Sequence, residues 1–482
     1  KKNKTPIYLV GGYVRDLLRG KKNSQDIDFV VEGSGITFTE EFDKAIKQIG
    51  RLVTFPEFDT ARYLFLDESD KILLELEFAG ARSEEYEKNS RKPKVAGTTL
   101  AQDLARRDFT VNAMAIDVAK YLSAVTQREK VKNKETRKID KRIIIDPFDG
   151  QSDLKDGVLR TPLDPDKTFL DDPLRMMRAM RFAGQLELSV APHTLEAIYR
   201  NRQRLKIVSA ERIQEELLKM LACEKPSVCF TLMFQTHLLD EVLPEVARLD
   251  GVEEVYGHQH KNNLVHTFKV VDNVAERTDK IMLRFAGLLH DIGKFKTKQF
   301  IPKIGWTFYQ HEHVGKKLVY GIAKRLRLST KDTNYLALLV RWHQHPIGLM
   351  DLGITDSAVR RLIVNLQDNL GDLLILGVSD ITTGNPYKLE KRQKNYERLK
   401  LRIAEVFEKD KLRAFQSPVR GEEIMELCGL KPGPTVGKIK YAIEDAILDG
   451  IIPNEYEAAK EYFINIKGQY LSKTEEWEKI IC

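Results

Sequence analysis

Residues 9–33 read LVGGYVRDLLRGKKNSQDIDFVVEG. Gly11 and Gly12 lead into a short helical run, and the apolar stretch around Asp26 and Asp28 predicts a strand. Because side chains alternate along a strand, the two carboxylates lie on one face while their apolar neighbours face a core. Paired carboxylates repel each other, whereas Mg²⁺ prefers oxygen ligands and leaves coordination positions open for substrate phosphates. The pattern therefore indicates a two-metal phosphoryl displacement, with the glycines letting backbone N–H groups approach a triphosphate.

Further motifs follow in order along the chain. They are RRDFTVNAMA at 106–115, DPFDGQSDL at 146–154, DDPLRMMRAMRF at 171–182 and ERIQEELLKML at 211–221. Together with GGYVRDLLRG and DID, they resemble the signature of the polymerase-beta-like nucleotidyltransferases. The resemblance is to the bacterial branch that holds tRNA CCA-adding enzymes and poly(A) polymerases. An ordered set of motifs is far more specific than a bare Asp-x-Asp.

The hydrophobic pattern changes along the chain. Strand-like and helical runs mix in the first third, whereas helical periodicity dominates from Asp166 onward. Pattern and resemblance together predict a multidomain α+β protein, in which a polymerase-beta-like head with a mixed sheet and helices precedes an all-α neck, body and tail. The expected divisions are the head at 1–155, a helical neck and body for base recognition and RNA binding at 156–255, an HD domain at 256–385, and a helical RNA-binding tail at 386–482.

Composition limits the class of protein. The chain has 482 residues, of which 31% are charged and 42% hydrophobic, with a net charge of +7. These values fit a globular, helix-rich protein of several domains and permit a nucleic-acid partner without establishing one. No apolar run approaches the ~20 residues of a membrane span, no signal peptide is visible, and the four cysteines lack metal-ligand spacing. We expect a cytoplasmic enzyme without membrane partners; the resemblance implies tRNA, CTP and ATP as partners, and no DNA.

A third head carboxylate is expected on a neighbouring strand. The run ILLELEFAGAR places Glu75 and Glu77 on one face. The family's third acid lies five residues before an arginine, so Arg82 makes Glu77 the preferred match, with Glu75 as the alternative. The resemblance thus implies Asp26, Asp28 and Glu77 as catalytic acids, with Asp26 and Asp28 holding Mg²⁺.

Polar residues in the later motifs are candidates for nucleotide binding. A guanidinium fork fits phosphate oxygens at two points, and the resemblance implies that Arg107 and Asn112 face the triphosphate while Asp108 holds the ribose. The stretch 84–103 resembles the family's flexible loop, with an ordinary linker as the alternative. The basic run 128–142 is expected to be a solvated surface excursion, with an RNA contact as the alternative. The expected nucleotide-binding residues are Gly11, Gly12, Arg15, Arg107, Asp108, Asn112, Asp172, Arg175, Arg178 and Arg181.

Asp172 and Arg175 carry the most specific expectation. With Pro173 in the first turn, the two are expected three residues apart on one helix. A carboxylate accepts a hydrogen bond and a guanidinium donates one, which matches the edges of cytosine and adenine but not of uracil and guanine. From these residues alone a surface ion pair is the alternative; the resemblance implies a protein template for C and A. Arg178 and Arg181 continue this face and either touch phosphate or cap the neck, while Asp171 stands where the family often has Glu.

The histidines form a second group. Eight of the ten lie between residues 258 and 345, and one of them is followed directly by an aspartate. Imidazole and carboxylate together suit first-row divalent metals. The spacing resembles that of the HD phosphohydrolase domain, a fold that can also persist as an inactive scaffold. The resemblance implies His266, His290, Asp291 and Asp380 as metal ligands, with His313 and His345 as further candidates.

The resemblance implies template-independent addition of C and A from CTP and ATP to the 3′ end of tRNA. Mg²⁺ is expected in the head and a divalent transition metal in the HD domain. The alternatives are a poly(A) polymerase, an A-only or CC-only enzyme, an RNA-binding protein with an inactive head, and a chain whose main activity is HD phosphohydrolysis. In the tail, the loop at 430–438 is expected to offer backbone N–H groups to an RNA phosphate at a helix start, with a packed helical hairpin as the alternative.

Overall fold

The computed structural model describes residues 5–21, 26–85, 94–130, 141–352, 355–410 and 417–480. The chain divides into two compact units, 1–247 and 248–482, which are described separately below. The middle of the expected flexible loop and most of the basic run at 128–142 lie outside the described residues.

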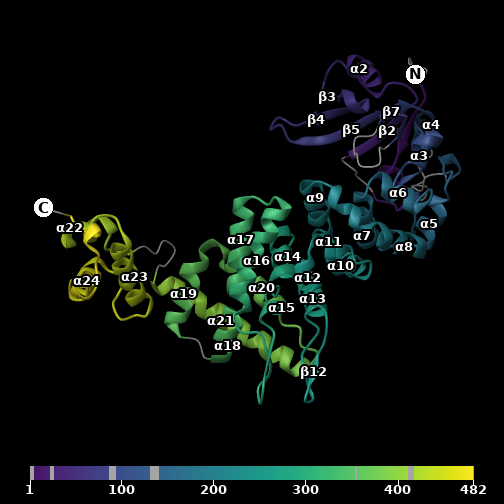
Figure 1. Cartoon of the computed structure of the whole chain (residues 1–482). Helices are drawn as coiled ribbons and strands as arrows, with labels where there is room; N and C mark the ends of the chain where they lie inside the picture. Colours follow the sequence, from purple (N-terminus) through teal and green to yellow (C-terminus); the bar gives the residue numbers. More distant parts are fainter. Residues whose placement is uncertain are drawn as a thin grey trace. The chain divides into compact units, whose positions relative to one another are not determined.

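A seven-stranded mixed sheet forms the core of the first unit (Figure 1). Its strand order is β3-β4-β5-β2-β1-β8-β9, and β2 pairs antiparallel with β1 and parallel with β5. The apolar face of β2 is buried as predicted, because Phe29 stacks on Phe78 of β5 with ring centroids 4.7 Å apart. Phe38 and Phe42 of α2 pack against the same Phe78 ring. The sheet elements are β1 (Ile7–Val10), β2 (Asp26–Val31), β3 (Arg51–Phe55), β4 (Thr60–Leu66), β5 (Ile72–Gly80), β8 (Ala115–Asp117) and β9 (Ile144–Ile145), with helices α1 (Gly12–Leu18), α2 (Gly35–Ala45), α3 (Leu100–Ala105), α4 (Val118–Lys130) and α5 (Gly150–Asp156) and the hairpin β6 (Arg82–Glu85) and β7 (Lys94–Gly97).

Helices complete the first unit. Helix α7 is its central element and packs against α9 and α10, and Arg181 of α7 donates from Nε to Glu216 of α9 at 2.7 Å. A short parallel pair, β10 with β11, precedes and follows α7. The elements are β10 (Val158–Leu159), α6 (Pro165–Asp171), α7 (Leu174–Leu186), β11 (Ser189–Val190), α8 (Pro192–Asn201), α9 (Ala210–Leu221), α10 (Pro226–Gln235), α11 (Leu238–Val242) and α12 (Pro244–Ala247).

Helices also dominate the second unit, but it contains two small hairpins that the sequence did not predict (Figure 1). Their strands are only two or three residues long, which is too short to show an alternation of apolar and polar residues. The elements are β12 (Glu254–Val255), β13 (His258–Gln259), α13 (Asn263–Ala275), α14 (Ile281–Leu289), α15 (Lys294–Thr297), β14 (Gln299–Ile301), β15 (Gly305–Thr307), α16 (His311–Leu326), α17 (Thr330–Trp342), α18 (His345–Leu352), α19 (Asp356–Leu366), α20 (Leu370–Ser379) and α21 (Pro386–Asp410).

The tail forms its own apolar cluster around Ile439 and Phe463. Its helices are α22 (Gly421–Cys428), α23 (Pro434–Leu448) and α24 (Tyr456–Leu471). The expected phosphate position at the start of α23 is already taken by a carboxylate. The backbone N–H of Thr435 donates to Glu478 Oε2 at 2.8 Å, and its hydroxyl lies 3.2 Å from Oε1. The packed helical hairpin, given as the alternative, describes this loop better than an RNA-phosphate site.

Among the helices of the described ranges, none combines the length and the apolar character needed to cross a bilayer.

Candidate functional site

The head carboxylates lie on two neighbouring strands. In the parallel pairing of β2 with β5, Asp28 is opposite Glu77 and Asp26 is opposite Glu75. Arg62 of β4 donates from Nε to Glu77 Oε2 at 2.8 Å and lies 3.2 Å from Glu75 Oε1. Burial, followed by the charges of Asp26 and Glu77, raises the pKa of Asp28 to about 6. The four acids therefore form one negative patch whose repulsion a divalent cation would relieve.

A cavity of about 500 Å³ adjoins this patch. It is strongly polar, and its arginines come from α1, from the segment after α3, from α7 and from α9. All of the residues expected to bind nucleotide line it, together with Asp28 of the carboxylate patch. The lining residues are Gly11, Gly12, Arg15, Asp28, Arg106, Arg107, Asp108, Asn112, Asp172, Leu174, Arg175, Arg178, Arg181, Phe182, Gln185 and Arg212.

Gly11 fits a position that no other residue tolerates well. Its φ of +67° lies in the left-handed region, where L side chains are strained. A Cβ there would lie 3.0 Å from Nη1 of Arg107 and 3.4 Å from Oδ2 of Asp28. The glycine thus lets a cation from one motif and a carboxylate from another approach each other across the strand end.

Asp108 and Asn112 are held by arginines. Arg178 donates from Nε and Nη2 to Asp108 Oδ2 at 2.8 and 2.6 Å, and Asn112 donates to Asp108 Oδ1 at 3.1 Å. Arg15 in turn donates to Asn112 Oδ1 at 2.7 Å. Burial alone would raise the pKa of Asp108, but Arg178 and Asn112 hold it below its ordinary value. The network fixes the side chains expected near the sugar and phosphates before substrate arrives.

Asp172 and Arg175 both line the cavity, but they do not share a helix as expected. Asp172 is extended and lies between α6 and α7, because a residue before proline disfavours helical backbone. Its Oδ1 accepts from the N–H of Leu174, and its Oδ2 accepts from Arg212 at 2.8 Å. Arg175 donates to the carbonyl of Thr168 at 3.4 Å, a long contact that leaves the guanidinium beside the cavity.

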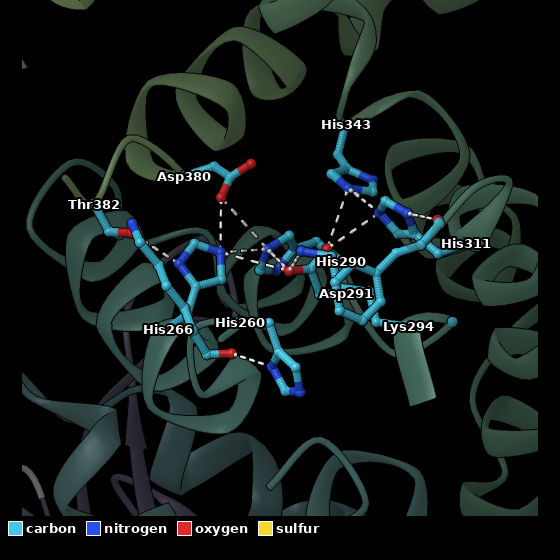
Figure 2. A network of polar contacts seen from close by, with 12 residues as sticks. His260, His266, His290, Asp291, Lys294, His311, His343, Asp380 and Thr382 are labelled. Atoms are coloured by element: carbon cyan, nitrogen blue, oxygen red, sulfur yellow. Dashed lines mark hydrogen bonds and ion pairs between the residues drawn. The ribbon is translucent and has the colours of Figure 1, made fainter. Parts of the chain in front are cut away.

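The histidine site consists of two groups of possible metal ligands that touch (Figure 2). The first is His266, His290 and Asp380, and the second is Asp291, His311 and His343. Asp291 lies between them. Its Oδ2 is 3.2 Å from His290 Nε2, and its Oδ1 is 3.2 Å from His311 Nε2 and 3.6 Å from His343 Nε2. His266 Nε2 lies 2.9 Å from Asp380 Oδ1.

The backbone orients the histidine rings toward the centre of the site. Nδ1 donates to a carbonyl at 2.8 Å in His290, 2.9 Å in His311 and 2.8 Å in His343. Since a carbonyl only accepts, each Nδ1 carries a proton and each Nε2 faces the carboxylates. Metal-binding histidines are typically fixed in this way. The donor set of imidazole nitrogens and carboxylate oxygens therefore fits divalent transition metals.

The site's electrostatics also match metal binding. Burial alone would lower the pKa of His290, yet Asp291 and Asp380 raise it to about 10. Burial would likewise raise the pKa of Asp291, but His290 and Lys294 hold it well below its ordinary value. A proton on His290 thus occupies the place that a cation would take.

Three family models match successive parts of the chain. Residues 7–160 match the Poly A polymerase head domain, residues 187–249 the probable RNA and SrmB-binding site of polymerase A, and residues 263–379 the HD domain. The multifunctional CCA protein of Pseudomonas fluorescens (strain Pf0-1) is 33% identical over 363 residues, which span 72% of this chain and 76% of that protein. The A-adding tRNA nucleotidyltransferase of Deinococcus radiodurans is 31% identical over 369 residues, 74% of this chain and 78% of that protein.

The chain belongs to the tRNA nucleotidyltransferase family. The fold agrees: the Bacillus stearothermophilus CCA-adding enzyme in complex with CTP superposes with a TM-score of 0.62 at 20% identity, over 98% of this chain and 95% of that one. The predicted α+β fold and the predicted family are therefore confirmed, and the chain is a nucleotidyltransferase with an HD domain. The four domain boundaries and the roles of single residues stay predictions.

Sequence reasoning missed several residues of this nucleotidyltransferase's sites, and Arg212, His311 and His343 show why. Arg212 lies in the ERIQEELLKML motif, yet nothing local shows that it reaches Asp172. His311 and His343 join the HD groups, whereas the expected further candidates His313 and His345 belong to neither group. His311 and His343 each have a second histidine two residues further along the chain, so only the folded backbone decides which histidine of each pair faces inward.

Proposed function

We propose that the head transfers CMP and AMP from CTP and ATP to the 3′ end of tRNA and releases pyrophosphate. The observation that carries this proposal is the polar cavity. It brings Asp28 of the carboxylate patch, several arginines, Asp172 and Arg175 around one space of about 500 Å³. The printed names of the relatives, multifunctional CCA protein and A-adding tRNA nucleotidyltransferase, support the same substrate class.

Asp26, Asp28 and Glu77 would hold Mg²⁺ in the head. When bound, Mg²⁺ supplies a lowered pKa for the attacking 3′-hydroxyl and neutralises the leaving pyrophosphate. Arg15 and Arg107 place positive charge beside the triphosphate, where a guanidinium contacts two oxygens at once.

The base would be read by Asp172 and Arg175. The carboxylate of Asp172 is already oriented by Leu174 N–H and by Arg212, so it keeps one geometry for a base amino group. Arg175 offers donors to the ring nitrogen beside that amino group. Because the two contacts would be made by protein, no nucleic-acid template is needed.

The test offers the purified protein three tRNAs, which end before the first C, before the second C and before the terminal A. CTP and ATP are supplied separately, and product lengths are measured. Addition to all three supports full CCA synthesis, whereas extension of only one class identifies an A-only or CC-only enzyme. Long homopolymers of A would identify a poly(A) polymerase, and no extension of any tRNA would contradict the proposal.

A second activity is favoured by the position of Asp291. A carboxylate shared by two groups of histidine and aspartate ligands would hold two divalent cations at one centre, as in metal-dependent phosphoester hydrolysis. We propose that the HD domain catalyses this reaction, in which water attacks phosphorus and the ester oxygen leaves. The test loads the full chain with Mn²⁺, Co²⁺ or Ni²⁺ and measures hydrolysis of bis(p-nitrophenyl) phosphate, and a protein that binds none of these ions contradicts the proposal.

A further inference from the structure

The two hairpins of the second unit have an unusual composition. Residues 292–311, which contain β14 and β15, hold four lysines and five aromatic residues but no acid. The hairpin of β12 and β13 contacts this one through β13 and β15, and Figure 1 shows both projecting beyond the neighbouring helices. A basic segment rich in aromatic residues has the chemistry that binds single-stranded nucleic acid.

The aromatic rings of the two hairpins form a continuous row. Tyr256 lies at the tip of the first hairpin, with its ring centroid 6.1 Å from that of Phe300. Phe300 is 5.5 Å from Trp306, Trp306 is 5.3 Å from the ring of His260, and His260 is 5.8 Å from Phe308. These separations are the usual spacing of packed aromatic side chains.

The row ends at the histidine site. Lys294 Nζ lies 5.6 Å from the centre of the Phe308 ring and 2.5 Å from Asp291 Oδ2. The carbonyl of Phe308 accepts the hydrogen bond from Nδ1 of His311. One end of the row is therefore linked, through Lys294, to the carboxylate that the two ligand groups share.

The other end of the row is open to solvent. Tyr256 is 91% exposed, and Lys296 and Lys303 are exposed as well. Lys298 lies 4.7 Å above the Trp306 ring and pairs with Glu253 at 2.9 Å, so one lysine is neutralised locally. Packing between the hairpins accounts for the inner rings, whereas Tyr256 at the tip keeps most of its surface in water and so is accessible to a ligand.

We propose that this row, from Tyr256 to Phe308, is a binding surface for single-stranded nucleic acid that leads to the histidine site. Bases stack on the exposed ring faces, lysines pair with phosphates, and a phosphoester is delivered next to Asp291. The proposal names the substrate class of the HD phosphoesterase and so rests on that proposed activity. A surface of this kind tolerates any base, because every base has a π-face.

Binding is tested with the full chain and a fluorescein-labelled single-stranded RNA of about eight nucleotides, which matches the site size of such surfaces. Tyr256→Ala should weaken binding about tenfold, and Tyr256→Phe should restore it because the stacking face remains. Tyr387→Ala is the matched control, since Tyr387 is also a highly exposed tyrosine of the second unit, on α21. It should bind as the wild type does. Equal binding by Tyr256→Ala and the wild type would overturn the proposal.

Position is tested by photocrosslinking an RNA of the same length that contains 5-iodouridine. Crosslinks should map to peptides 254–261 and 299–309, and crosslinks confined to the head or tail would overturn the proposal.

Hydrolysis separates this proposal from the one on which it rests. In Tyr256→Ala, kcat/KM for the RNA relative to bis(p-nitrophenyl) phosphate should fall about tenfold. If Tyr256→Ala hydrolyses RNA as well as the wild type does, only the proposed binding surface is refuted. If binding depends on Tyr256 but the protein hydrolyses neither substrate, only the proposed phosphoesterase activity is refuted.

Discussion

Asp28 in the head is a partly buried carboxylate and Asp291 in the HD domain a fully buried one, and the charges around them are of opposite sign. Asp28 faces other acids, which together with burial raise its pKa to about 6. Asp291 lies among histidines and Lys294, which hold its pKa well below the ordinary value. In the head, Arg62 and Arg107 offset only part of the negative charge, and an added cation would relieve the rest. In the HD groups, a proton on His290 and the charge of Lys294 offset the carboxylates, and a metal bound there would displace that proton.

This comparison separates two kinds of metal site within one chain. In the head, acids on adjacent strands offer only oxygen ligands, which suits Mg²⁺ brought together with a triphosphate. In the HD domain, imidazole nitrogens fixed by backbone carbonyls suit transition metals that stay bound. The predictions below test this separation.

The largest effect is expected from the head acids. Asp28→Ala or Asp26→Ala should slow nucleotide addition by at least about a thousandfold, because one of the metal positions is lost. Binding of tRNA should change little, since the helical domains are expected to hold the RNA. Asp70→Ala, which removes an exposed acid from the turn between β4 and β5, is the control and should keep the wild-type rate. Single-turnover incorporation measures all three, and near-native rates in the Asp28 variant would remove the two-metal assignment.

Glu77 and Glu75 form a matched pair that tests the third ligand. Glu77 is opposite Asp28 and contributes to its raised pKa, whereas Glu75 is opposite Asp26, two residues earlier on β2. We expect Glu77→Ala to reduce kcat by about a hundredfold and Glu75→Ala by about threefold or less. Steady-state incorporation of CTP decides between them, and the reverse order would make Glu75 the third acid.

Arg175→Ala tests whether the base edge is read by protein. Each buried polar group left unpaired costs roughly 1–3 kcal/mol, so use of CTP and ATP should fall by about ten- to a hundredfold. The difference in incorporation between CTP or ATP and UTP or GTP should narrow, because uracil and guanine do not make the contact that is lost. Incorporation of all four nucleotides on one tRNA is the measurement. An equal loss for all four would show that Arg175 supports phosphate binding or the fold.

Arg178→Ala tests the fixed network beside the carboxylates. Arg178 holds the pKa of Asp108 below its ordinary value. Their pairing therefore stabilises the fold at pH values above the ordinary Asp pKa of about 3.9. This stabilisation is lost as the pH falls through the lowered pKa. Without Arg178, burial should raise the pKa of Asp108, and the variant should lose about 2 kcal/mol at pH 7. The stability gap between wild type and variant should shrink from pH 7 to pH 4 in a series of thermal unfolding experiments. A gap that stays constant with pH would show that the loss is packing alone.

The sequence predicted those parts of the molecule that depend on neighbours along the chain. The strand that carries Asp26 and Asp28 follows from alternation, and the cavity residues follow from short motifs whose order matches a family. The sequence did not predict contacts between segments that are far apart along the chain. Arg212 reaches Asp172 from another helix, and Glu478 blocks the start of α23 from the far end of the tail.

The HD site shows why a motif can locate a region without fixing its ligands. His311 lies at the start of α16 with its Nδ1 held by the carbonyl of Phe308, whereas His313, two residues on, is half exposed beside Glu312. His343 lies at the end of α17 and is buried, whereas His345 begins α18 and its ring packs against Trp342. A change of two residues alters the direction of a side chain on a helix, and spacing alone does not reveal which residue faces the centre.

The claim that two chemically separate sites share this chain is tested most directly by inactivating each site in turn and measuring both activities. Nucleotide addition to tRNA and hydrolysis of bis(p-nitrophenyl) phosphate are measured on the same preparations of wild type, Asp28→Ala and Asp291→Ala, with Asp380→Asn as a milder HD variant and circular dichroism to confirm folding. Asp28→Ala should lose addition and keep hydrolysis, and both HD variants should lose hydrolysis and keep addition. A folded HD variant that also loses addition, or an Asp28 variant that loses hydrolysis, would contradict the separation.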